Sequence, residues 1–181
     1  MATALAQMTA EAFENLPECD RKLELNNGMV VEVDMALAGH EKVKAQLNRL
    51  LVRALSDDDF VVAPEAVNRL SENVDRVPDL AIWRLTEFMQ MDSDRTIVGG
   101  PLIAIEVVSS ETAQELDEKI RQYFAAGTQL VWVVYPRTRA IEIERPNGST
   151  RLSGGDLLQA PELIPGLSVP VSAIFALLEQ D

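Results

Sequence analysis

The 181-residue chain is poor in the residues that most readily mark a redox compartment or a metal site. It contains one cysteine, Cys19, and one histidine, His40. A lone cysteine cannot form a disulfide within the chain, and no second cysteine or histidine stands at metal-ligand spacing from it. These absences exclude an intramolecular disulfide and a cysteine-based metal site, and Cys19 is expected to be an inert small residue.

Long apolar runs are also lacking. No stretch approaches the ~20 apolar residues that a helix needs to cross a bilayer. The first residues, Met1-Ala2-Thr3-Ala4, lack the basic start and apolar run of a signal peptide. The chain is therefore expected to be cytoplasmic, with no membrane partner.

Positive charge is scarce. The chain carries 16 lysines and arginines against 29 aspartates and glutamates, for a net charge of -13. Duplex binding normally draws its affinity from lysines and arginines that neutralise phosphates, so this balance argues against a simple DNA-binding protein. Any contact with nucleic acid must be local, and helped by divalent cations or by a second subunit.

The composition is otherwise that of an ordinary globular protein, with 47% hydrophobic and 25% charged residues. A chain of this length can bury roughly 70% of its unfolded surface, so it can form a substantial core. Residues 1–181 are predicted to form a single domain.

The pattern of apolar residues predicts alternating helices and strands. The spacing of three and four residues predicts a helix over 40–55, and a capping box at Thr112 and Glu115 predicts another that ends at Gly127. An Asn-Gly turn predicts a hairpin over 22–33, and residues 84–100 are predicted to be a loop. Further helices are expected over 9–16 and 171–178, and further strands over 60–63, 79–83, 102–108, 131–135 and 140–144. The order predicts a mixed α/β fold.

Three charged residues stand out in this pattern. Asp79 follows Pro78 at the start of one strand, and Glu106 interrupts the most apolar strand. A buried carboxylate is costly unless it is paired or bound to a metal. Mg²⁺ (or Mn²⁺) takes oxygen ligands, so Asp79, Glu106 and the backbone carbonyl of Val107 are candidate ligands if the two strands are neighbours.

Lys119 is the third. At 100° per residue it flanks the face formed by Leu116 and Tyr123, whereas Glu118 faces solvent. A lysine there could reach the strand ends and stabilise charge that builds on a phosphate. Each of the three residues also has an ordinary structural interpretation, as a strand-start aspartate, a solvated glutamate and a lysine with a partly buried stem.

Two further residues are candidates with an open alternative. Glu24 lies on a strand between Leu23 and Leu25, where alternation favours a solvent-facing position over ligation. His40 begins a helix, and an N-terminal turn residue is the favoured interpretation because it has no partner histidine.

An ordered set of motifs resembles the Uma-type family of restriction-endonuclease-like proteins, over nearly the whole chain. The motifs are 8–13 with Leu16-Pro17, Leu23-Glu24-Leu25 with Gly28, Pro78-Asp79-Leu80, 105–109, Lys119, Tyr123, Gly127, 131–134, Gly155-Asp156 and 164–167. That family is similar in fold to the PD-(D/E)XK nucleases, whose core is a central mixed β-sheet flanked by helices. The resemblance therefore implies an α/β, restriction-endonuclease-like fold.

The resemblance also implies roles for particular residues. Asp79 and Glu106 would be metal ligands, and Lys119 would be the catalytic lysine. The superfamily usually places that lysine two residues beyond the glutamate, where this chain has Val108; in the Uma-type family it lies on the following helix. Glu24 matches an upstream acidic position, and His40 matches a further one.

The sequence thus predicts an Mg²⁺- or Mn²⁺-dependent endonuclease that hydrolyses DNA. The net charge of -13, unlike the basic cleft of the superfamily's DNA enzymes, favours an alternative, a nuclease-fold binding or scaffold protein with an inactive site. A nuclease that acts on another phosphorylated substrate is a third possibility. A homodimer is expected from the superfamily, although no residue marks an interface.

Overall fold

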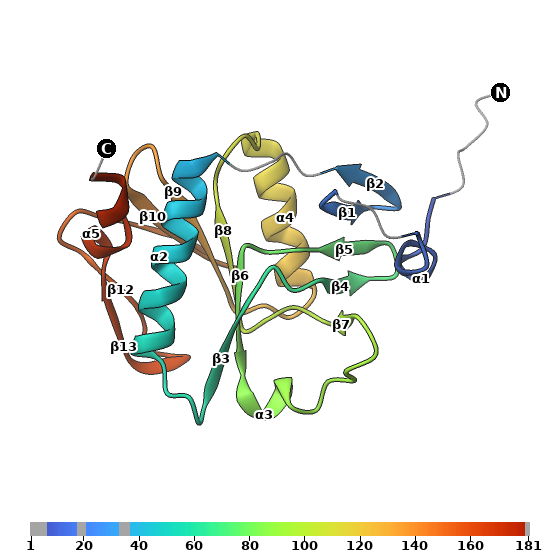
Figure 1. The fold of residues 1–181 in the computed structure, drawn as a ribbon, viewed down its shortest axis with the longest axis horizontal. Coiled ribbons are helices and arrows are strands. Elements are labelled where there is room, and N and C mark those ends of the chain that lie inside the picture. Colours follow the sequence, from blue (N-terminus) through green and yellow to red (C-terminus); the bar gives the residue numbers. More distant parts are fainter. Residues whose placement is uncertain (1–6, 18–20, 33–36, 180–181) are drawn as a thin grey trace.

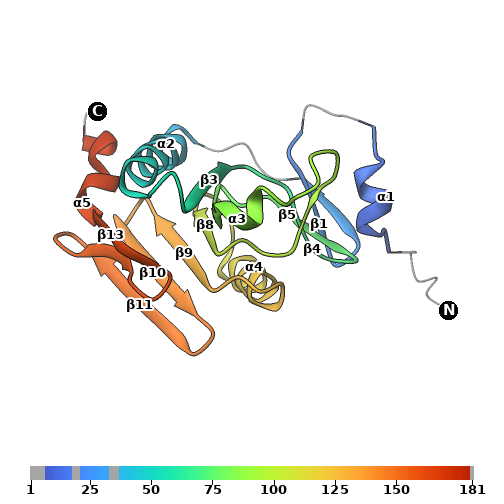
Figure 2. The same ribbon diagram turned by 90° about the horizontal axis from the view of Figure 1, so that it is seen from below.

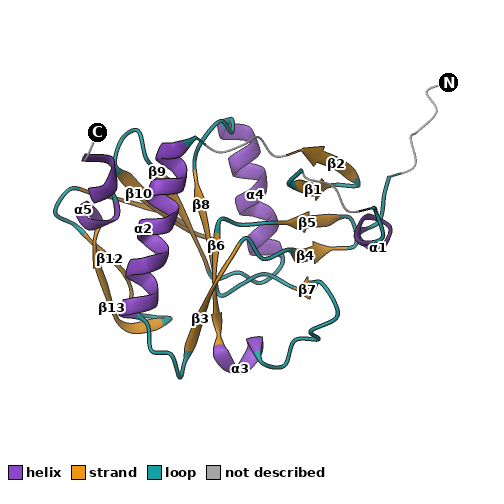
Figure 3. Cartoon of the chain, viewed as in Figure 1, coloured by secondary structure: helices purple, strands orange, loops and turns teal. Residues whose placement is uncertain are grey.

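A computed structural model describes residues 7–17, 21–32 and 37–179. Within these residues the strands form a six-stranded central sheet, a five-stranded flanking sheet and a two-stranded hairpin, with helices between them (Figures 1 and 3). Cys19, and Val33 at the end of the predicted hairpin, lie outside the described residues.

The central sheet has the order β11-β10-β9-β8-β6-β3. It is mixed, because β8 and β9 are parallel while the other neighbouring pairs are antiparallel. Its strands are β3 (Phe60–Pro64), β6 (Leu80–Arg84), β8 (Ile103–Val107), β9 (Leu130–Tyr135), β10 (Ala140–Arg145) and β11 (Gly148–Ser153). Every residue of β8 is buried, as a strand covered on both faces requires.

The flanking sheet has the order β2-β1-β5-β4-β7. Its strands are β1 (Leu23–Asn26), β2 (Met29–Glu32), β4 (Asn68–Ser71), β5 (Val74–Arg76) and β7 (Ile97–Val98). The chain runs from β5 through three residues directly into β6 of the central sheet. This junction places Asp79 where the two sheets meet.

Helices cover both faces of the central sheet (Figure 2). On one face, α2 (Ala38–Ala54) packs with β13 (Ile164–Pro170) and α5 (Val171–Ile174) against Leu80, Ile105 and Trp132. On the other face, α4 (Ala113–Ala125) packs against Ala104, Val131 and Val133. The alternation of residues along β8 therefore sends Ala104 and Glu106 toward α4, because successive side chains point to opposite faces.

The remaining elements are short. They are α1 (Ala10–Glu14), α3 (Leu85–Phe88), β12 (Leu157–Ala160), which pairs with β13, and the 3₁₀ helix η1 (Ala176–Glu179). None of the helices in the described part of the chain has the length and apolar character to span a bilayer. The cytoplasmic location and the single domain remain predictions.

The α/β fold with a central mixed sheet and flanking helices is confirmed, and so are most predicted elements. The capping box is present, with the Thr112 hydroxyl accepting from the Glu115 amide and the Glu115 carboxylate accepting from the Thr112 amide. The hairpin turns at Asn27 and Gly28, both with positive φ, as a type I′ turn requires.

One predicted element was wrong: residues 84–100 are not one loop, since they contain α3 and β7. The segment before the C-terminal helix, where no strand was predicted, contains the β12–β13 hairpin. Pro165 and Pro170 are exposed positions of β13, which pairs only with β12, so their missing amides face no second neighbour.

Candidate active site

The predicted site residues meet at one end of the central sheet. β6 and β8 are antiparallel neighbours with Leu80 opposite Ile105, so Asp79 and Glu106 lie one position further along each strand. Lys119 reaches Glu106 from α4, and Glu24 of β1 lies on the other side of the same ammonium group. All four side chains are buried.

Asp79 is held by two donors on one oxygen. Its Oδ2 accepts from the Val107 amide at 2.7 Å and lies 3.1 Å from His40 Nε2. Burial alone would raise the pKa of Asp79, but the hydrogen bond and positive charge of His40, together with the Val107 amide, lower it below its usual value. Asp79 is therefore an anion, and its Oδ1 carries neither of these bonds.

His40 lies between two carboxylates. Its Nε2 faces Asp79, and its Nδ1 is 3.2 Å from Glu41 Oε1. Burial would lower the pKa of His40, but the hydrogen bonds and charges of Asp79 and Glu41 raise it above its usual value. Since both ring nitrogens face acceptors, both donate, as in the imidazolium form. The prediction of an ordinary N-terminal turn residue was therefore incomplete: His40 lies in the first turn of α2, but it is buried and paired with Asp79.

Glu106 has a different environment. Its Oε1 accepts from the Tyr123 hydroxyl at 2.7 Å, and its Oε2 accepts from Lys119 Nζ at 3.5 Å. Burial raises the pKa of Glu106 to about 7, because the charges of Asp79 and Glu24 add to that rise while Lys119 and Tyr123 only partly oppose it. Burial is thus the main cause of the raised pKa, and the neighbouring carboxylates add to it.

Lys119 is surrounded by carboxylates. Besides Glu106, its Nζ lies 3.6 Å from Glu111 Oε1 and 3.9 Å from Glu24 Oε1. Burial would lower the pKa of Lys119, but these three acids raise it above its usual value. The side chain is an ammonium at neutral pH.

Glu24 is not solvent-facing, so the interpretation from strand alternation was wrong. It is 2% exposed, and its Oε2 accepts from Arg76 Nη1 at 2.7 Å while its Oε1 accepts from the Val77 amide at 3.1 Å. The alternation of β1 is intact, but the face opposite Leu23 and Leu25 is covered by α4 instead of water, and Arg76 of the neighbouring strand β5 lies beside Glu24. Glu24 is thus part of the buried cluster.

The residues around Asp79 and Glu106 fit a hard divalent cation. Two buried carboxylates from neighbouring strands are the kind of ligand that Mg²⁺ selects, and Mg²⁺ needs only one or two carboxylates because it keeps several waters. No group of three or more histidine, cysteine, aspartate or glutamate side chains in the described residues is arranged to hold a metal alone.

A pocket of about 370 Å³ opens beside Lys119. Glu24, Arg76 and Lys119 form its buried side. Its remaining lining is mostly polar or acidic: Asn26, Val31, Glu32, Ser109, Ser110, Glu111, Thr112, Glu115 and Glu118. The pocket gives Glu24, Arg76 and Lys119 an opening to solvent, whereas Asp79 and Glu106 do not line it.

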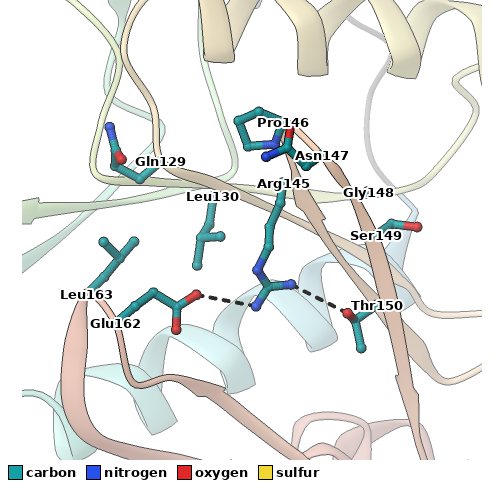
Figure 4. Close-up of a pocket in the computed structure, with 10 residues that line it drawn as sticks. All are labelled: Gln129, Leu130, Arg145, Pro146, Asn147, Gly148, Ser149, Thr150, Glu162 and Leu163. Atoms are coloured by element: carbon teal, nitrogen blue, oxygen red, sulfur yellow. Dashed lines mark hydrogen bonds and ion pairs between the residues drawn. The ribbon is translucent and has the colours of Figure 1, made fainter.

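A second pocket, of about 420 Å³, contains none of the predicted site residues (Figure 4). It lies between the β10–β11 hairpin and Glu162-Leu163. Arg145 crosses it and donates to Glu162 Oε1 at 3.4 Å and to Thr150 Oγ1 at 3.5 Å. Arg145, the one cationic side chain in the lining of this pocket, is therefore already paired with other residues of the protein.

Sequence reasoning missed two members of the cluster, Arg76 and Glu111. Arg76 lies on β5, a strand of three residues that is too short to show alternation. Glu111 precedes the capping threonine of α4 and resembles a loop residue. Tyr123 was assigned only to the apolar face of its helix, and its hydroxyl gave no separate signal.

Comparison with known proteins identifies the family to which the chain belongs. The family model described as "Uma2: Putative restriction endonuclease" matches residues 10–172. The chain belongs to the Uma2 family. That membership confirms the resemblance based on the motifs, and the match includes all the residues of the cluster.

A solved structure has the same fold as this Uma2 chain. It is the crystal structure of a protein from Anabaena variabilis ATCC 29413, described as "a putative nuclease belonging to DUF820". The TM-score is 0.83 at 17% sequence identity, over 94% of this chain and 99% of that one. At this identity the likeness establishes the restriction-endonuclease-like fold alone. No curated protein matches the chain.

Proposed function

We propose that this Uma2 protein is a metal-dependent endonuclease that hydrolyses phosphodiester bonds in DNA. The observation that supports it best is that Asp79, Glu106 and Lys119 belong to one buried cluster, although Asp79 and Lys119 are 40 residues apart in the sequence. The family description supports a nuclease, and the cluster supports this particular chemistry.

Asp79 and Glu106 would hold Mg²⁺ or Mn²⁺, with the Val107 carbonyl as a third protein ligand. Support comes from the Val107 amide, whose bond to Asp79 brings the backbone of Val107 beside that carboxylate. The chemistry that such an ion supplies is activation of a water and polarisation of a phosphoryl oxygen. Glu24 and His40 would act on this site indirectly, because Glu24 is held by Arg76 and His40 is paired with Asp79.

Lys119 would act as a cation and donor instead of a base. Its raised pKa keeps the ammonium charged at neutral pH. In that state it would donate to the attacking hydroxide and to phosphoryl oxygens as their negative charge increases, which is worth about 10²–10³ in rate for a single donor in comparable sites.

The experiment is cleavage of supercoiled plasmid and single-stranded DNA at low salt, with Mg²⁺, Mn²⁺ or EDTA. Low salt strengthens the weak electrostatic attraction that an acidic protein can offer to DNA. Asp79→Asn and Lys119→Met should each lose cleavage. Arg53→Met is the matched control, because it also removes one positive charge but lies exposed in the last turn of α2, away from His40 in the first.

Cutting that requires the metal and is lost in both site variants, but kept by Arg53→Met, would support the proposal. Cutting that survives Asp79→Asn would contradict it. Absence of cutting by the wild type under every condition would favour the second candidate.

That second candidate is a nuclease-fold binding or scaffold protein with an inactive site. It is favoured by the net charge of -13 and by the glutamates that line the pocket beside Lys119. Calorimetric titration with Mn²⁺ separates the two. An inactive site would bind the ion no better than the Asp79→Asn variant does.

A homodimer is part of the proposal. β2 is the outer strand of the flanking sheet, and Met29, Val30 and Val31 are exposed on it. An open strand edge with apolar side chains is suited to pairing with another strand, and a second copy would supply one by two-fold symmetry.

A further inference from the structure

Two side chains of α4 donate hydrogen bonds to the carboxylate of Glu106, one to each oxygen. The Tyr123 hydroxyl donates to Oε1 at 2.7 Å, and Lys119 Nζ donates to Oε2 at 3.5 Å. They are four residues apart on one helix, so they project from the same face. Each carboxylate oxygen therefore has its own donor.

The tyrosine has little freedom to point elsewhere. Tyr123 is 0% exposed and packs in the cluster of Ala104, Leu116, Val131 and Val133 between α4 and the central sheet. A buried tyrosine hydroxyl needs a partner, and here the partner is a carboxylate, which makes the bond charge-assisted. The ring position fixes the direction of the bond.

The two acids at the strand ends are oriented by different donors. Asp79 accepts hydrogen bonds from His40 and from the backbone amide of Val107. In the described residues Glu106 accepts no hydrogen bond from a backbone amide, and the shorter of its two side-chain hydrogen bonds is the one from Tyr123. A side chain in this position decides the rotation of the carboxylate about its terminal torsion, which is otherwise broad.

We infer that Tyr123 is a positioning residue for Glu106: its hydroxyl fixes the carboxylate so that the remaining lone pairs stay available to a cation shared with Asp79. The inference rests on the proposed metal-dependent function. It assigns Tyr123 no contact with the substrate. This positioning role can be told apart from a packing role, because phenylalanine at position 123 would fill the same space without donating a hydrogen bond to Glu106.

The first test measures Mn²⁺ affinity by calorimetry. Tyr123→Phe should bind Mn²⁺ about 10–100-fold more weakly than the wild type, which is the usual effect of removing a group that orients a metal ligand. Tyr135→Phe is the matched control, since the Tyr135 hydroxyl also donates to a glutamate, Glu142, at 3.3 Å on the central sheet. The control should bind as the wild type does.

The second test leaves the residue in place. The chain has only two tyrosines, Tyr123 and Tyr135, so labelling with 3-fluorotyrosine gives two fluorine resonances, which the Tyr135→Phe variant assigns. Addition of Mg²⁺ should shift the Tyr123 resonance and leave that of Tyr135 unchanged.

The outcomes separate the two proposals. If the wild type binds no Mn²⁺, the metal-dependent function fails and the positioning role fails with it. If the wild type binds and Tyr123→Phe binds equally well, the positioning role alone is overturned. If Tyr123→Phe does not fold, the fluorine spectrum decides: a Tyr123 resonance that Mg²⁺ leaves unchanged overturns the inference, and one that moves supports it.

Discussion

Asp79 and Glu106 occupy equivalent positions at the ends of neighbouring strands, yet the pKa values of their carboxyl groups are shifted in opposite directions. The pKa of Asp79 is lowered because His40 and the Val107 amide outweigh its burial. The pKa of Glu106 is raised because its burial outweighs Lys119. At neutral pH one acid is fixed as an anion while the other is close to its midpoint, so the two are distinct in the metal-free protein.

This difference predicts a pH-dependent stability of the metal-free protein. Glu106 titrates near its ordinary value of 4.5 when unfolded and at about 7 when folded. The folded state therefore binds the proton more tightly, and this stabilisation is complete below pH 4.5 and is lost as the pH rises to about 7. We expect the free energy of unfolding to fall by on the order of 3 kcal/mol across that interval, as measured by urea denaturation.

The control is Glu106→Gln, which should remove most of that fall. His40 contributes in the same direction, because its raised pKa gives stability that is lost as the pH rises through its folded value. A residual slope in the variant is thus expected. An unchanged slope would show that Glu106 is not the titrating group.

The buried ion pair of Arg76 and Glu24 predicts a large cost of mutation. Arg76→Met leaves the Glu24 carboxylate buried without its main cation, which should destabilise the protein by about 3–5 kcal/mol. Arg95→Met removes an exposed partner of Asp92 and should cost less than about 1 kcal/mol. Equal midpoints for the two variants in urea denaturation would contradict the structural role given to Arg76.

At the scale of the element, α4 connects the fold to the site. It carries Lys119 and Tyr123 on its buried face, and Thr112 and Glu115 cap its beginning. The cap precedes the site residues by about two turns, so it sets where the helix starts and hence which side chains face the sheet.

Loss of this cap predicts a moderate destabilisation. Thr112→Ala removes the side-chain acceptor for the Glu115 amide and should cost about 1 kcal/mol. The measurement is the midpoint of thermal or urea unfolding. Thr86→Ala, at an exposed position of the short helix α3, is the comparison, and a similar loss in both variants would count against the cap.

Long elements could be predicted from the sequence because their patterns extend over several turns or a full strand. The helices α2 and α4 and the strand β8 were found for this reason, and with them the joint position of Asp79, Glu106 and Lys119. The short strands β4, β5 and β7 were missed, whereas the equally short β1 and β2 were found through the Asn-Gly turn between them. Such strands are specified by their neighbours in the sheet, since a window that short contains too few residues to show a period.

The error at Glu24 has a related cause. Alternation along β1 correctly separates its two faces, but it cannot say what covers the second face. That face meets Arg76 and Lys119, which are 52 and 95 residues later in the sequence (76 - 24 and 119 - 24). The partners of a buried charge are a property of the tertiary structure.

For the whole molecule, the net charge of -13 predicts that DNA binding depends on divalent cations. Without them, repulsion should leave no measurable affinity for a labelled duplex in fluorescence anisotropy at low salt. Mg²⁺ should give binding that weakens as monovalent salt is added. Equal binding in Mg²⁺ and in EDTA would contradict this expectation, and would point to a basic surface elsewhere on the chain.

The proposed homodimer predicts a mass of about twice 20.0 kDa in size-exclusion chromatography with light scattering. Val30→Lys would place a charge on the open edge of β2 and should give a monomer if that edge forms the interface. A monomeric wild type at micromolar concentration would contradict the dimer. A dimer that tolerates Val30→Lys would locate the interface elsewhere.

The spread of the site along the chain has a consequence for how the protein is made. Glu24, Asp79, Glu106 and Glu111 leave the ribosome before Lys119, the cation that three of them surround. Because domains form as the chain emerges from its N-terminus, the acids exist for a time without this partner. The cluster can close only when α4 docks on the central sheet, so the arrival of one helix converts a set of mutually repelling charges into an ordered site.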